Sequence, residues 1–290
     1  MHTGRVVVVG SINVDLVTRV ERHVRPGETI LGRELDTLAG GKGANQAVAA
    51  RAAGAMVLMS GCVGADAVGQ AYLRRLAGLG IDCSHVRVDP DVPTGHAFIC
   101  VADDGENAIV VIPGANGRVG ARDSLPDDLA PADVVVLQLE IPPETVSSVV
   151  RTASSRGARV VVNMSPYAAL PSDVVAAADP LIVNEHEASL LADSDLVPAS
   201  LLVTFGAAGA SWDGVQAPGA AVPAADVLDT TGAGDAFCGA LAASLAAGLD
   251  RSHAMAAALA AGAEAVKTVG AQPDSALRSD ASRDAEPSGH

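Results

Sequence analysis

A run of small residues leads into a carboxylate and then into a helical pattern late in the chain: Gly232-Ala233-Gly234-Asp235. A helix N-terminus leaves its first backbone N–H groups without intrahelical partners and carries partial positive charge. Because Gly232, Ala233 and Gly234 have almost no side chain, an anion can approach those N–H groups closely. Asp235 would then stand beside the bound anion. An anion cradle with an adjacent base is what phosphoryl transfer to an alcohol needs.

The helical pattern after this run is clear, but the run alone has an ordinary alternative. Phe237, Leu241 and Leu245 recur every four residues and predict a helix with one apolar face, which Gly248 ends. The alternative is a loop with Asp235 as a simple N-cap, because Asp is favoured there. A helix N-terminus also favours the charged form of Asp235, so we expect a low pKa and a main role in aligning a hydroxyl.

A second glycine motif, Gly40–Gln46, lies far upstream and again precedes a helical pattern. It presents a cation, Lys42, and two amides, Asn45 and Gln46, beside a turn. Such donors and acceptors suit a hydroxylated ligand. The motif is not a Walker A loop, because Gly43 follows the lysine where Ser or Thr would be required. A plain turn with a solvated lysine is the alternative.

Together the two motifs resemble the paired signatures of the ribokinase or phosphofructokinase-B carbohydrate kinase family. The resemblance extends from about Val6 to Pro273, and residues 10–15 and 40–46 are most similar to the ribose kinases of that family. It implies an α/β fold with a mostly parallel central sheet, helices on both faces and a small antiparallel β lid. It also implies ATP-dependent phosphorylation of the 5-hydroxyl of D-ribose, with Asp235 as base and the 232–234 turn as anion hole.

The resemblance implies a sugar site built from both motifs and from two further segments. Its residues are Asn13, Asp15, Gly41, Lys42, Asn45, Glu140 and Asp235. A carboxylate can accept two hydroxyl hydrogen bonds, which suits a vicinal diol. Glu140 follows an apolar strand, at the edge where ligands bind in open α/β sheets. Taken singly, each polar residue could equally be a cap or a solvated side chain.

The resemblance also implies a nucleotide site with magnesium. Its ATP-binding residues are Asn184, Thr204, Phe205, Gly206, Ala207, Ala208, Gly209 and Gly234. Glu187 would hold magnesium through water, because this ion prefers oxygen ligands and retains waters. A surface helix carboxylate is the alternative for Glu187.

A site for an activating potassium ion is implied as well. Its residues are Asp229, Thr231, Ala265, Thr268, Gly270 and Asp274, several of them through backbone carbonyls. Asp274 departs from the family, which commonly has Ser there. The extra carboxylate would either strengthen cation binding or place a surplus charge at the site.

Apolar runs separated by helical patterns predict a parallel sheet that is covered on both faces. The runs are Val6–Val9, Met56–Ser60, Val134–Leu137, Val160–Val162, Leu181–Val183 and Leu201–Thr204. Two ribbons are typical of antiparallel lid strands, Val14–Val20 with Glu28–Leu35 and His96–Val101 with Asn107–Ile112. We therefore expect one domain over residues 1–274, with lid strands at about 13–37 and 94–112, and a disordered tail over 275–290.

Two segments are shorter than the family usually has. The stretch Ala188 to Ser200 is brief where the family has an extra helix, which puts the adenine contacts and the nucleotide preference in doubt. The last family helix after Pro273 also has no counterpart. No predicted catalytic position is lost by either change.

Composition agrees with a metabolic enzyme and argues against other classes. The net charge is -15 without a basic run, which disfavours nucleic acid and anionic membranes as partners. The four cysteines are scattered without zinc spacing and no signal peptide is recognisable, so we expect a cytoplasmic protein. The family resemblance further suggests a homodimer through the lid. A nucleoside kinase or fructokinase of the same family, or a non-catalytic sugar or nucleotide sensor, remain alternatives.

Overall fold

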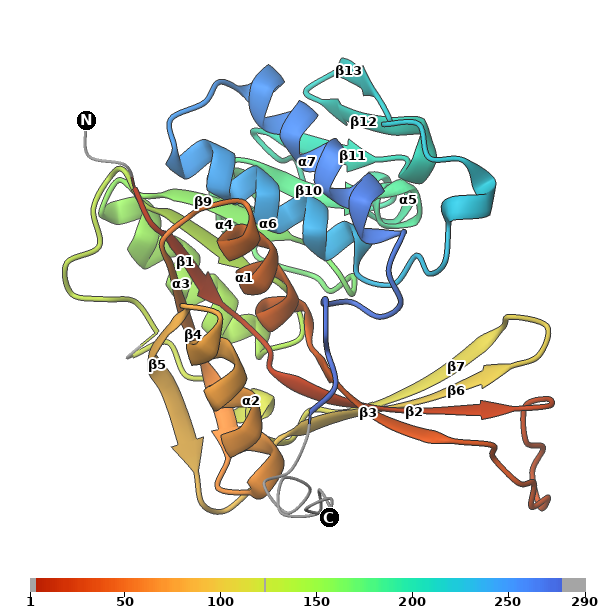
Figure 1. Ribbon diagram of the computed structural model, residues 1–290. Coiled ribbons are helices and arrows are strands. Elements are labelled where there is room, and N and C mark those ends of the chain that lie inside the picture. Colours follow the sequence, from red (N-terminus) through yellow and green to blue (C-terminus); the bar gives the residue numbers. More distant parts are fainter. Residues whose placement is uncertain (1–3, 123, 278–290) are drawn as a thin grey trace, which may run out of the picture.

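A nine-stranded sheet forms the centre of the molecule, and a four-stranded sheet projects from one side of it (Figure 1). The computed structural model describes residues 4–122 and 124–277. The large sheet has the order β13-β12-β11-β10-β9-β8-β1-β4-β5, and its neighbouring strands are parallel except in the pairs β11–β12 and β12–β13. Its strands are β1 Val6–Val9, β4 Val57–Gly64, β5 Asp82–Asp89, β8 Val134–Leu137, β9 Arg159–Asn163, β10 Leu181–Asn184, β11 Leu201–Thr204, β12 Gly209–Trp212 and β13 Val215–Pro218.

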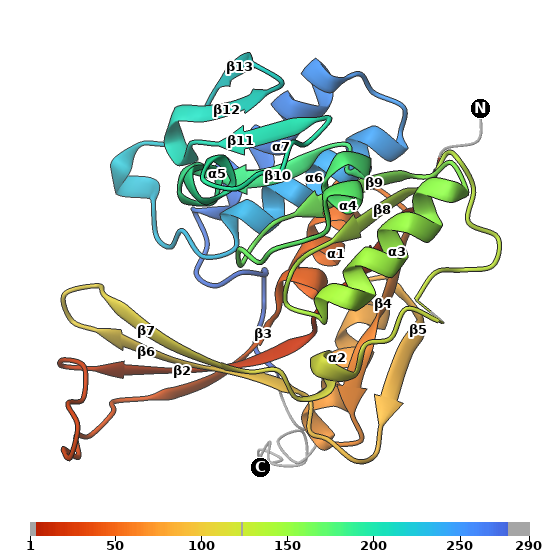
Figure 2. The same cartoon turned by 180° about the vertical axis from the view of Figure 1, so that it is seen from behind.

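Helices cover both faces of this sheet. One face carries α1 Lys42–Ala52, α2 Ala67–Gly78, α6 Ala233–Ala246 and α7 Arg251–Ala265; the other carries α3 Pro143–Ser155, α4 Ser172–Ala177 and α5 Glu185–Ala192 (Figure 2). Alternate residues of β1 point to opposite faces, so Val6 and Val8 join one core while Val7 and Val9 join the other. No helix in the described ranges is long and apolar enough to cross a membrane.

The apolar runs predicted six of these nine strands and missed β5, β12 and β13, and the predicted fold class is confirmed. The strands β1, β8 and β11 have the predicted bounds, and the helix after Gly232 ends at Ala246 with Gly248 just beyond it. Short 3-10 turns at Gly114–Arg118, Gly206–Ala208 and Ala224–Asp226 complete the elements. The chain between α5 and β11 contains no helix, as its length suggested.

The lid differs from its prediction in two ways. Its strands are β2 Asn13–Val20, β3 Leu35–Gly40, β6 Gly95–Ala102 and β7 Asn107–Ile112, in the order β3-β2-β6-β7. The return strand is Leu35–Gly40 and not Glu28–Leu35, because the pairing runs from Thr18 opposite Leu35 to Asn13 opposite Gly40. The central pair, β2 with β6, is parallel, whereas the two outer pairs are antiparallel. The lid therefore runs directly into the second glycine motif.

The chain continues as part of the fold beyond the predicted domain end at residue 274. Ser275 accepts a backbone hydrogen bond from Ala39 at 2.7 Å, and Leu277 donates one to Thr37 at 2.9 Å. Both bonds extend the edge of β3. The remainder of the predicted tail, residues 278–290, lies outside the described residues.

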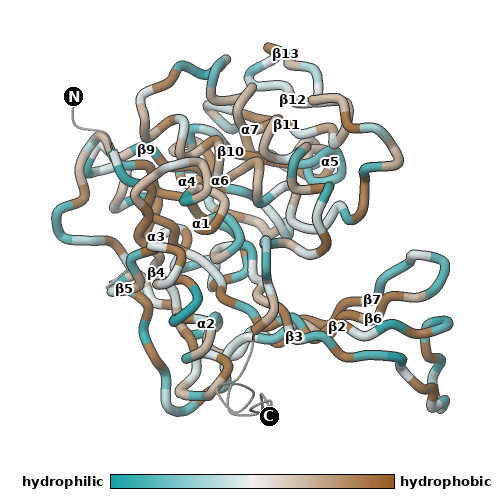
Figure 3. The backbone as a smooth tube through the Cα atoms, in the orientation of Figure 1, coloured by the Kyte–Doolittle hydropathy of each residue, from teal (hydrophilic) through white to brown (hydrophobic). Residues whose placement is uncertain are grey.

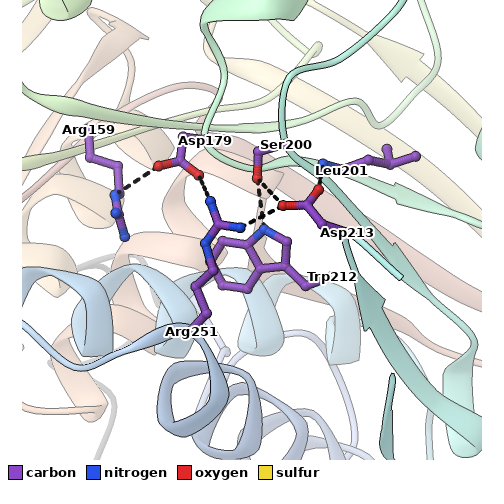
Figure 4. A network of polar contacts seen from close by, with 7 residues as sticks. All are labelled: Arg159, Asp179, Ser200, Leu201, Trp212, Asp213 and Arg251. Atoms are coloured by element: carbon purple, nitrogen blue, oxygen red, sulfur yellow. Dashed lines mark hydrogen bonds and ion pairs between the residues drawn. The ribbon is translucent and has the colours of Figure 1, made fainter. Parts of the chain in front are cut away.

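A polar network joins α7 to the edge of the large sheet where the parallel strands begin (Figure 4). Arg251 donates to Asp213 Oδ2 at 2.6 Å and to Asp179 Oδ1 at 3.2 Å, and its guanidinium carbon lies 4.8 Å from the Trp212 ring centroid. Trp212 Nε1 donates to Ser200 Oγ at 2.8 Å. We call this network the amino-edge network.

Candidate active site

The second glycine motif is attached to the carboxyl ends of β1 and β8 through Glu140. Glu140 Oε2 accepts hydrogen bonds from Ser11 Oγ at 2.5 Å and from the backbone N–H of Lys42 at 3.0 Å. Gly43 N donates to Ser11 Oγ at 3.2 Å, and a Cβ at this glycine would lie 2.5 Å from Ser11 N. Only glycine allows this close approach. Glu140 and Lys42, predicted as sugar contacts, are therefore neighbours.

Asn13 and Asp15 lie at the base of the lid, on the first residues of β2. Asn116 orients Asn13, because its Nδ2 donates to Asn13 Oδ1 at 2.6 Å while its own Oδ1 accepts from Ile12 N at 2.9 Å. Both asparagines are buried. Sequence reasoning missed Asn116, and the available signal was a polar residue just after the last lid strand, β7. A cavity of about 370 Å³ adjoins Asn13 and Glu140 and is largely apolar.

The carboxyl group of Asp15 is strongly perturbed. Burial raises its pKa, and the nearby charges of Glu140 and Asp235 raise it further, to about 7. A Cβ at Gly40 would lie 2.0 Å from Asp15 Oδ2, so the glycine leaves the room that this carboxyl group occupies. The structure thus brings three predicted site carboxylates into one electrostatic cluster.

Lys42 is the cation of this cluster. Burial lowers its pKa, but the charges of Asp235 and Glu140 outweigh that effect and raise the pKa above its usual value. Lys42 is therefore charged at neutral pH. Its positive charge partly compensates the negative charge of the neighbouring carboxylates.

Asp235 is buried at the first turn of α6, with 6 % of its surface exposed. Its Oδ2 accepts from Asn45 Nδ2 and its Oδ1 from Gln46 Nε2, each at 2.9 Å. The low pKa predicted from the helix terminus is wrong. Burial raises the pKa of Asp235 more than Lys42 and the two amides lower it. A raised pKa makes the carboxylate a better proton acceptor than an exposed aspartate.

The turn predicted as the anion hole lies at the N-terminus of α6, where the N–H of Ala233 donates to the Thr230 carbonyl at 3.3 Å. Gly232 is the N-cap of α6 with φ of 79°, and a Cβ there would lie 2.5 Å from the Cα of Ala271. By contrast, the space beside Gly234 is open, because no neighbouring segment among the described residues comes within 4 Å of where a Cβ would stand. The turn is thus fixed on one side and accessible on the other. Ala233 and Gly234 both line a large neighbouring pocket.

That pocket, of about 630 Å³, gathers most of the predicted nucleotide residues. Those that line it are Asn184, Thr204, Gly206, Ala207, Gly209 and Gly234, whereas Phe205 and Ala208 do not. Sequence reasoning missed other lining residues, which are small and apolar: Val222, Val227, Leu259, Ala263 and Val266. Such residues carry no motif and are indistinguishable in sequence from ordinary core positions. The pocket lining therefore combines polar residues with apolar ones.

Glu187 is neither exposed nor free. It forms a reciprocal capping box at the start of α5, in which its Oε2 accepts from Asn184 N at 2.9 Å and its N–H donates to Asn184 Oδ1 at 2.8 Å. Only 6 % of its surface is exposed, so it is not the surface carboxylate of the alternative interpretation. Its charge contributes to the raised pKa of Lys42, which places it near the carboxylate cluster. Its other carboxylate oxygen, Oε1, takes no part in the capping box.

The described part of the chain holds no group of three or more His, Cys, Asp or Glu side chains that could enclose a metal ion. Magnesium does not need such a group, because it is commonly bound by one or two carboxylates, waters and substrate phosphates. The carboxylate of Glu187, whose neighbours Asn184 and Glu185 line the large pocket, fits that mode of binding.

The residues predicted for potassium come from two loops that Asp229 joins. Asp229 accepts from Thr231 N at 2.8 Å and from Gly270 N at 2.9 Å. Burial raises the pKa of Asp229, but these hydrogen bonds lower it more, so the carboxylate is ionised. The Ala265 carbonyl accepts from Thr268 Oγ1 at 3.0 Å.

Asp274, the last residue of the predicted potassium set, is exposed. Its φ is 47°, and its carbonyl accepts from Arg75 Nη1 at 2.5 Å. The Asp274 carbonyl is therefore already a hydrogen-bond acceptor for an arginine.

Comparison with known proteins agrees with this arrangement. The family model for "pfkB family carbohydrate kinase" matches residues 3–277. The chain belongs to this family. A ribokinase of Bacillus subtilis (strain 168) is 36% identical over 276 residues, covering 91% of this chain and 94% of the relative. A ribokinase of Lactococcus lactis is 36% identical over 279 residues, with 92% of each chain covered.

Solved structures extend the comparison to the fold. The structure of Arabidopsis thaliana ribokinase complexed with ribose and ATP has a TM-score of 0.82 and 30% identity, covering 95% of this chain and 96% of that one. A nucleoside kinase of Methanocaldococcus jannaschii has a TM-score of 0.81 at 22% identity, with 94% of each chain covered, and shares the fold. The ribokinase-like fold and a carbohydrate kinase activity are thereby established for this chain.

Proposed function

We propose that this protein transfers the γ-phosphoryl group of ATP to the 5-hydroxyl of D-ribose, giving ribose 5-phosphate and ADP. The position of Asp235 carries the proposal. Its carboxylate is bonded to Asn45 and Gln46 on the sugar side, while Ala233 and Gly234, just before it, line the nucleotide pocket. A base at that junction can reach a hydroxyl aimed at the terminal phosphate of ATP. The ribokinase relatives support ribose as the acceptor.

In this proposal Asp235 accepts the proton of the attacking hydroxyl. The transition state of phosphoryl transfer is loose, so the proton can leave late, and the raised pKa of Asp235 makes that acceptance easier. The N–H groups of the turn Gly232–Gly234 stabilise the charge that develops on the transferring group. Lys42, which stays protonated, adds positive charge beside the same cluster.

The sugar is held by the polar residues at the base of the lid. Asn13, Asp15 and Glu140 supply acceptors for ribose hydroxyls, and Asn45 has one N–H beyond the one given to Asp235. Gly41, with φ of 89°, allows the backbone to turn against the sugar before α1 begins. The lid strands exclude water from the transfer.

On the nucleotide side, Asn184 and the 204–209 loop face the phosphates, with Glu187 holding magnesium through water. Magnesium supplies charge neutralisation between the phosphates when it is bound. The apolar lining residues Val222, Leu259 and Val266 suit the adenine face.

Two further parts of the proposal rest on family analogy. Potassium activates through the loops joined by Asp229, with carbonyls of Thr231, Ala265, Thr268 and Gly270 as candidate ligands. The chain forms a homodimer through the lid, where Phe98 and the residues 109–112 of β7 are exposed apolar groups and hydrophobic colour recurs along β6 and β7 (Figure 3). A cytoplasmic location also stays a prediction.

A panel of acceptors tests the proposal. We would follow ADP release from ATP and magnesium with ribose, deoxyribose, fructose and adenosine, each with potassium or with sodium in its place. Selective turnover of ribose, raised by potassium, is the expected result. Adenosine is included because the largely apolar cavity beside Asn13 could receive a base. Turnover of adenosine or fructose alone would contradict the choice of ribose, and no turnover with any acceptor would favour the sensor alternative.

A further inference from the structure

Both oxygens of the Asp235 carboxylate are held by side-chain amides, and each amide is held by a second one. Gln46 donates to Oδ1 and accepts from Gln138 Nε2 at 2.6 Å. Asn45 donates to Oδ2, and its own Oδ1 accepts from Gln272 Nε2 at 2.8 Å. All four amide residues are buried. Two amide pairs thus converge on one carboxylate from residues far apart in the chain.

In the pair formed by Asn45 and Gln272, Tyr72 determines which residue donates the hydrogen bond. The Tyr72 hydroxyl donates its single proton to the Gly40 carbonyl at 2.7 Å, so it must accept from Gln272 Nε2, also at 2.7 Å. The NH₂ group of Gln272 therefore faces Tyr72 and Asn45, and Arg75 Nε lies 3.4 Å from its Oε1. Asn45 must then turn its oxygen to Gln272 and its NH₂ group to Asp235.

The backbone that carries Gln272 is fixed on both sides. The segment 270–277, which we call the strap, donates its first N–H to Asp229 and packs its second residue under Gly232 of the anion hole. Arg75 donates to the carbonyls of the two residues after Gln272, one of them at 2.6 Å. In contrast, Oε1 of Gln138, at the end of the other amide pair, has no hydrogen-bond partner among the described residues. The Gln272 pair is the firmly anchored one.

We propose that Gln272 is a positioning residue for phosphoryl transfer: through Asn45 it fixes the orientation of the Asp235 carboxylate, although it does not touch the substrate. The inference rests on the proposed function in so far as Asp235 is the base. Because Asn45 and Gln46 use one lone pair on each oxygen, the remaining lone pairs have a fixed direction toward the acceptor hydroxyl. A misdirected base costs turnover more than it costs binding.

Replacing Gln272→Glu tests this directly, because the new side chain has the same shape but, when ionised, no donor. The Asn45 amide would then rotate and donate to the new carboxylate. This rotation turns the Asn45 oxygen toward the Asp235 carboxylate, and the two oxygens repel each other. We expect kcat to fall about 10- to 100-fold at pH 8, with KM for ribose and ATP changed less than about threefold. As the pH is lowered toward 6, the introduced carboxyl group gains a proton and can donate again. The ratio of variant to unchanged-protein kcat should therefore rise.

Two further variants isolate the donor. Gln272→Met removes it without adding charge, and its kcat should be low at every pH with no recovery at pH 6. Gln70→Glu adds the same charge on the exposed side of α2 and should leave kcat unchanged. Thermal unfolding of each variant checks the fold.

The outcomes separate this inference from the proposed function. Gln272 variants with the kcat of the unchanged protein would overturn the inference alone, as would a fall in kcat, affinity and melting temperature together without recovery at low pH. An unchanged protein that releases no ADP with any acceptor would overturn both. If it prefers an acceptor other than ribose, the same pH comparison is made with that acceptor, and the inference stands or falls on it.

Discussion

Aspartates lie in polar networks at both ends of the parallel strands, and the two networks are built from different partners. We call the end where the strands begin the amino edge and the end where they finish the carboxyl edge. At the amino edge, the side chains of Asp179 and Asp213 are about one third exposed and are paired with Arg251. At the carboxyl edge, Asp235 is 6 % exposed and is held by neutral amides. An arginine compensates the charge of a carboxylate, whereas a neutral amide orients a carboxylate without compensating its charge.

This difference suits the two edges to different tasks. The amino-edge network joins α7 to the sheet, and its exposed pairs are screened by solvent, so each contributes little. The amides at the carboxyl edge keep a buried carboxylate oriented while burial keeps its pKa raised. The comparison predicts that changes at the carboxyl edge alter turnover and that changes at the amino edge alter only stability.

The largest contrast should come from removing one carboxylate at each edge. Asp235→Asn should lower kcat about 10²- to 10⁴-fold while ribose still binds, because general base catalysis contributes that much. Asp213→Asn keeps an oxygen for the N–H of Leu201 and should leave kcat unchanged. Steady-state kinetics and calorimetric titration with ribose measure both effects. Near-normal turnover by Asp235→Asn would remove this residue from the mechanism.

Two glycines at opposite ends of α6 give a matched pair for the anion hole. Gly232 has φ of 79° and Gly248 has φ of 80°, so alanine at either position should cost about 1–2 kcal/mol of stability from backbone strain. Only at Gly232 would the new Cβ also meet Ala271, at 2.5 Å from its Cα.

Gly232→Ala should therefore lower kcat about 10²-fold by displacing anion-hole donors, and Gly248→Ala should not change it. Urea unfolding and kinetics on the two variants measure the difference. Equal kcat values in both would argue that the turn plays no part in catalysis.

Asp15→Asn should weaken function and raise stability. Because burial raises the folded-state pKa of Asp15 to about 7, the folded protein binds this proton more tightly than the unfolded chain, and its stability falls as pH rises from about 4 to 7. Asparagine does not ionise, so the stability of the variant does not fall in this way. At pH 8 its unfolding free energy should be about 1–3 kcal/mol higher than that of the unchanged protein. Its KM for ribose should rise about tenfold through a lost hydrogen bond.

Unfolding of Asp15→Asn and of the unchanged protein at pH 5 and pH 8 measures this effect. The gap between them should be small at pH 5 and wide at pH 8. A difference in unfolding free energy that does not depend on pH would mean that folding does not raise the pKa of Asp15.

The smallest effect is expected at the amino edge. Arg251→Ala removes two half-exposed ion pairs and the contact with Trp212, so it should lower the unfolding free energy by about 1 kcal/mol. kcat at 25 °C should not change. A reduced kcat in a fully folded sample of Arg251→Ala would show that the amino-edge network affects the active site.

The sequence predicted the elements better than the contacts between them. Apolar runs such as Val134–Leu137 are buried on both faces, and that pattern is local, so the bounds of β1, β8 and β11 were correct. Gln272 meets Asn45 across 227 residues, and no periodicity marks a single amide. The pKa of Asp235 was misjudged for the same reason: the helix terminus is visible in sequence, whereas burial by other elements is not. The predicted bounds of the return strand of the lid were wrong, because the register of that strand is set by its pairing with β2.

The central claim is that the carboxyl edge directs ATP to one hydroxyl of ribose. The most direct test is phosphorus and proton NMR of the product formed from ribose, ATP and magnesium. The account predicts a single phosphate ester on the 5-hydroxyl, formed in equal amount with ADP. A phosphate ester at any other position, or ADP formed without a sugar phosphate, would contradict it.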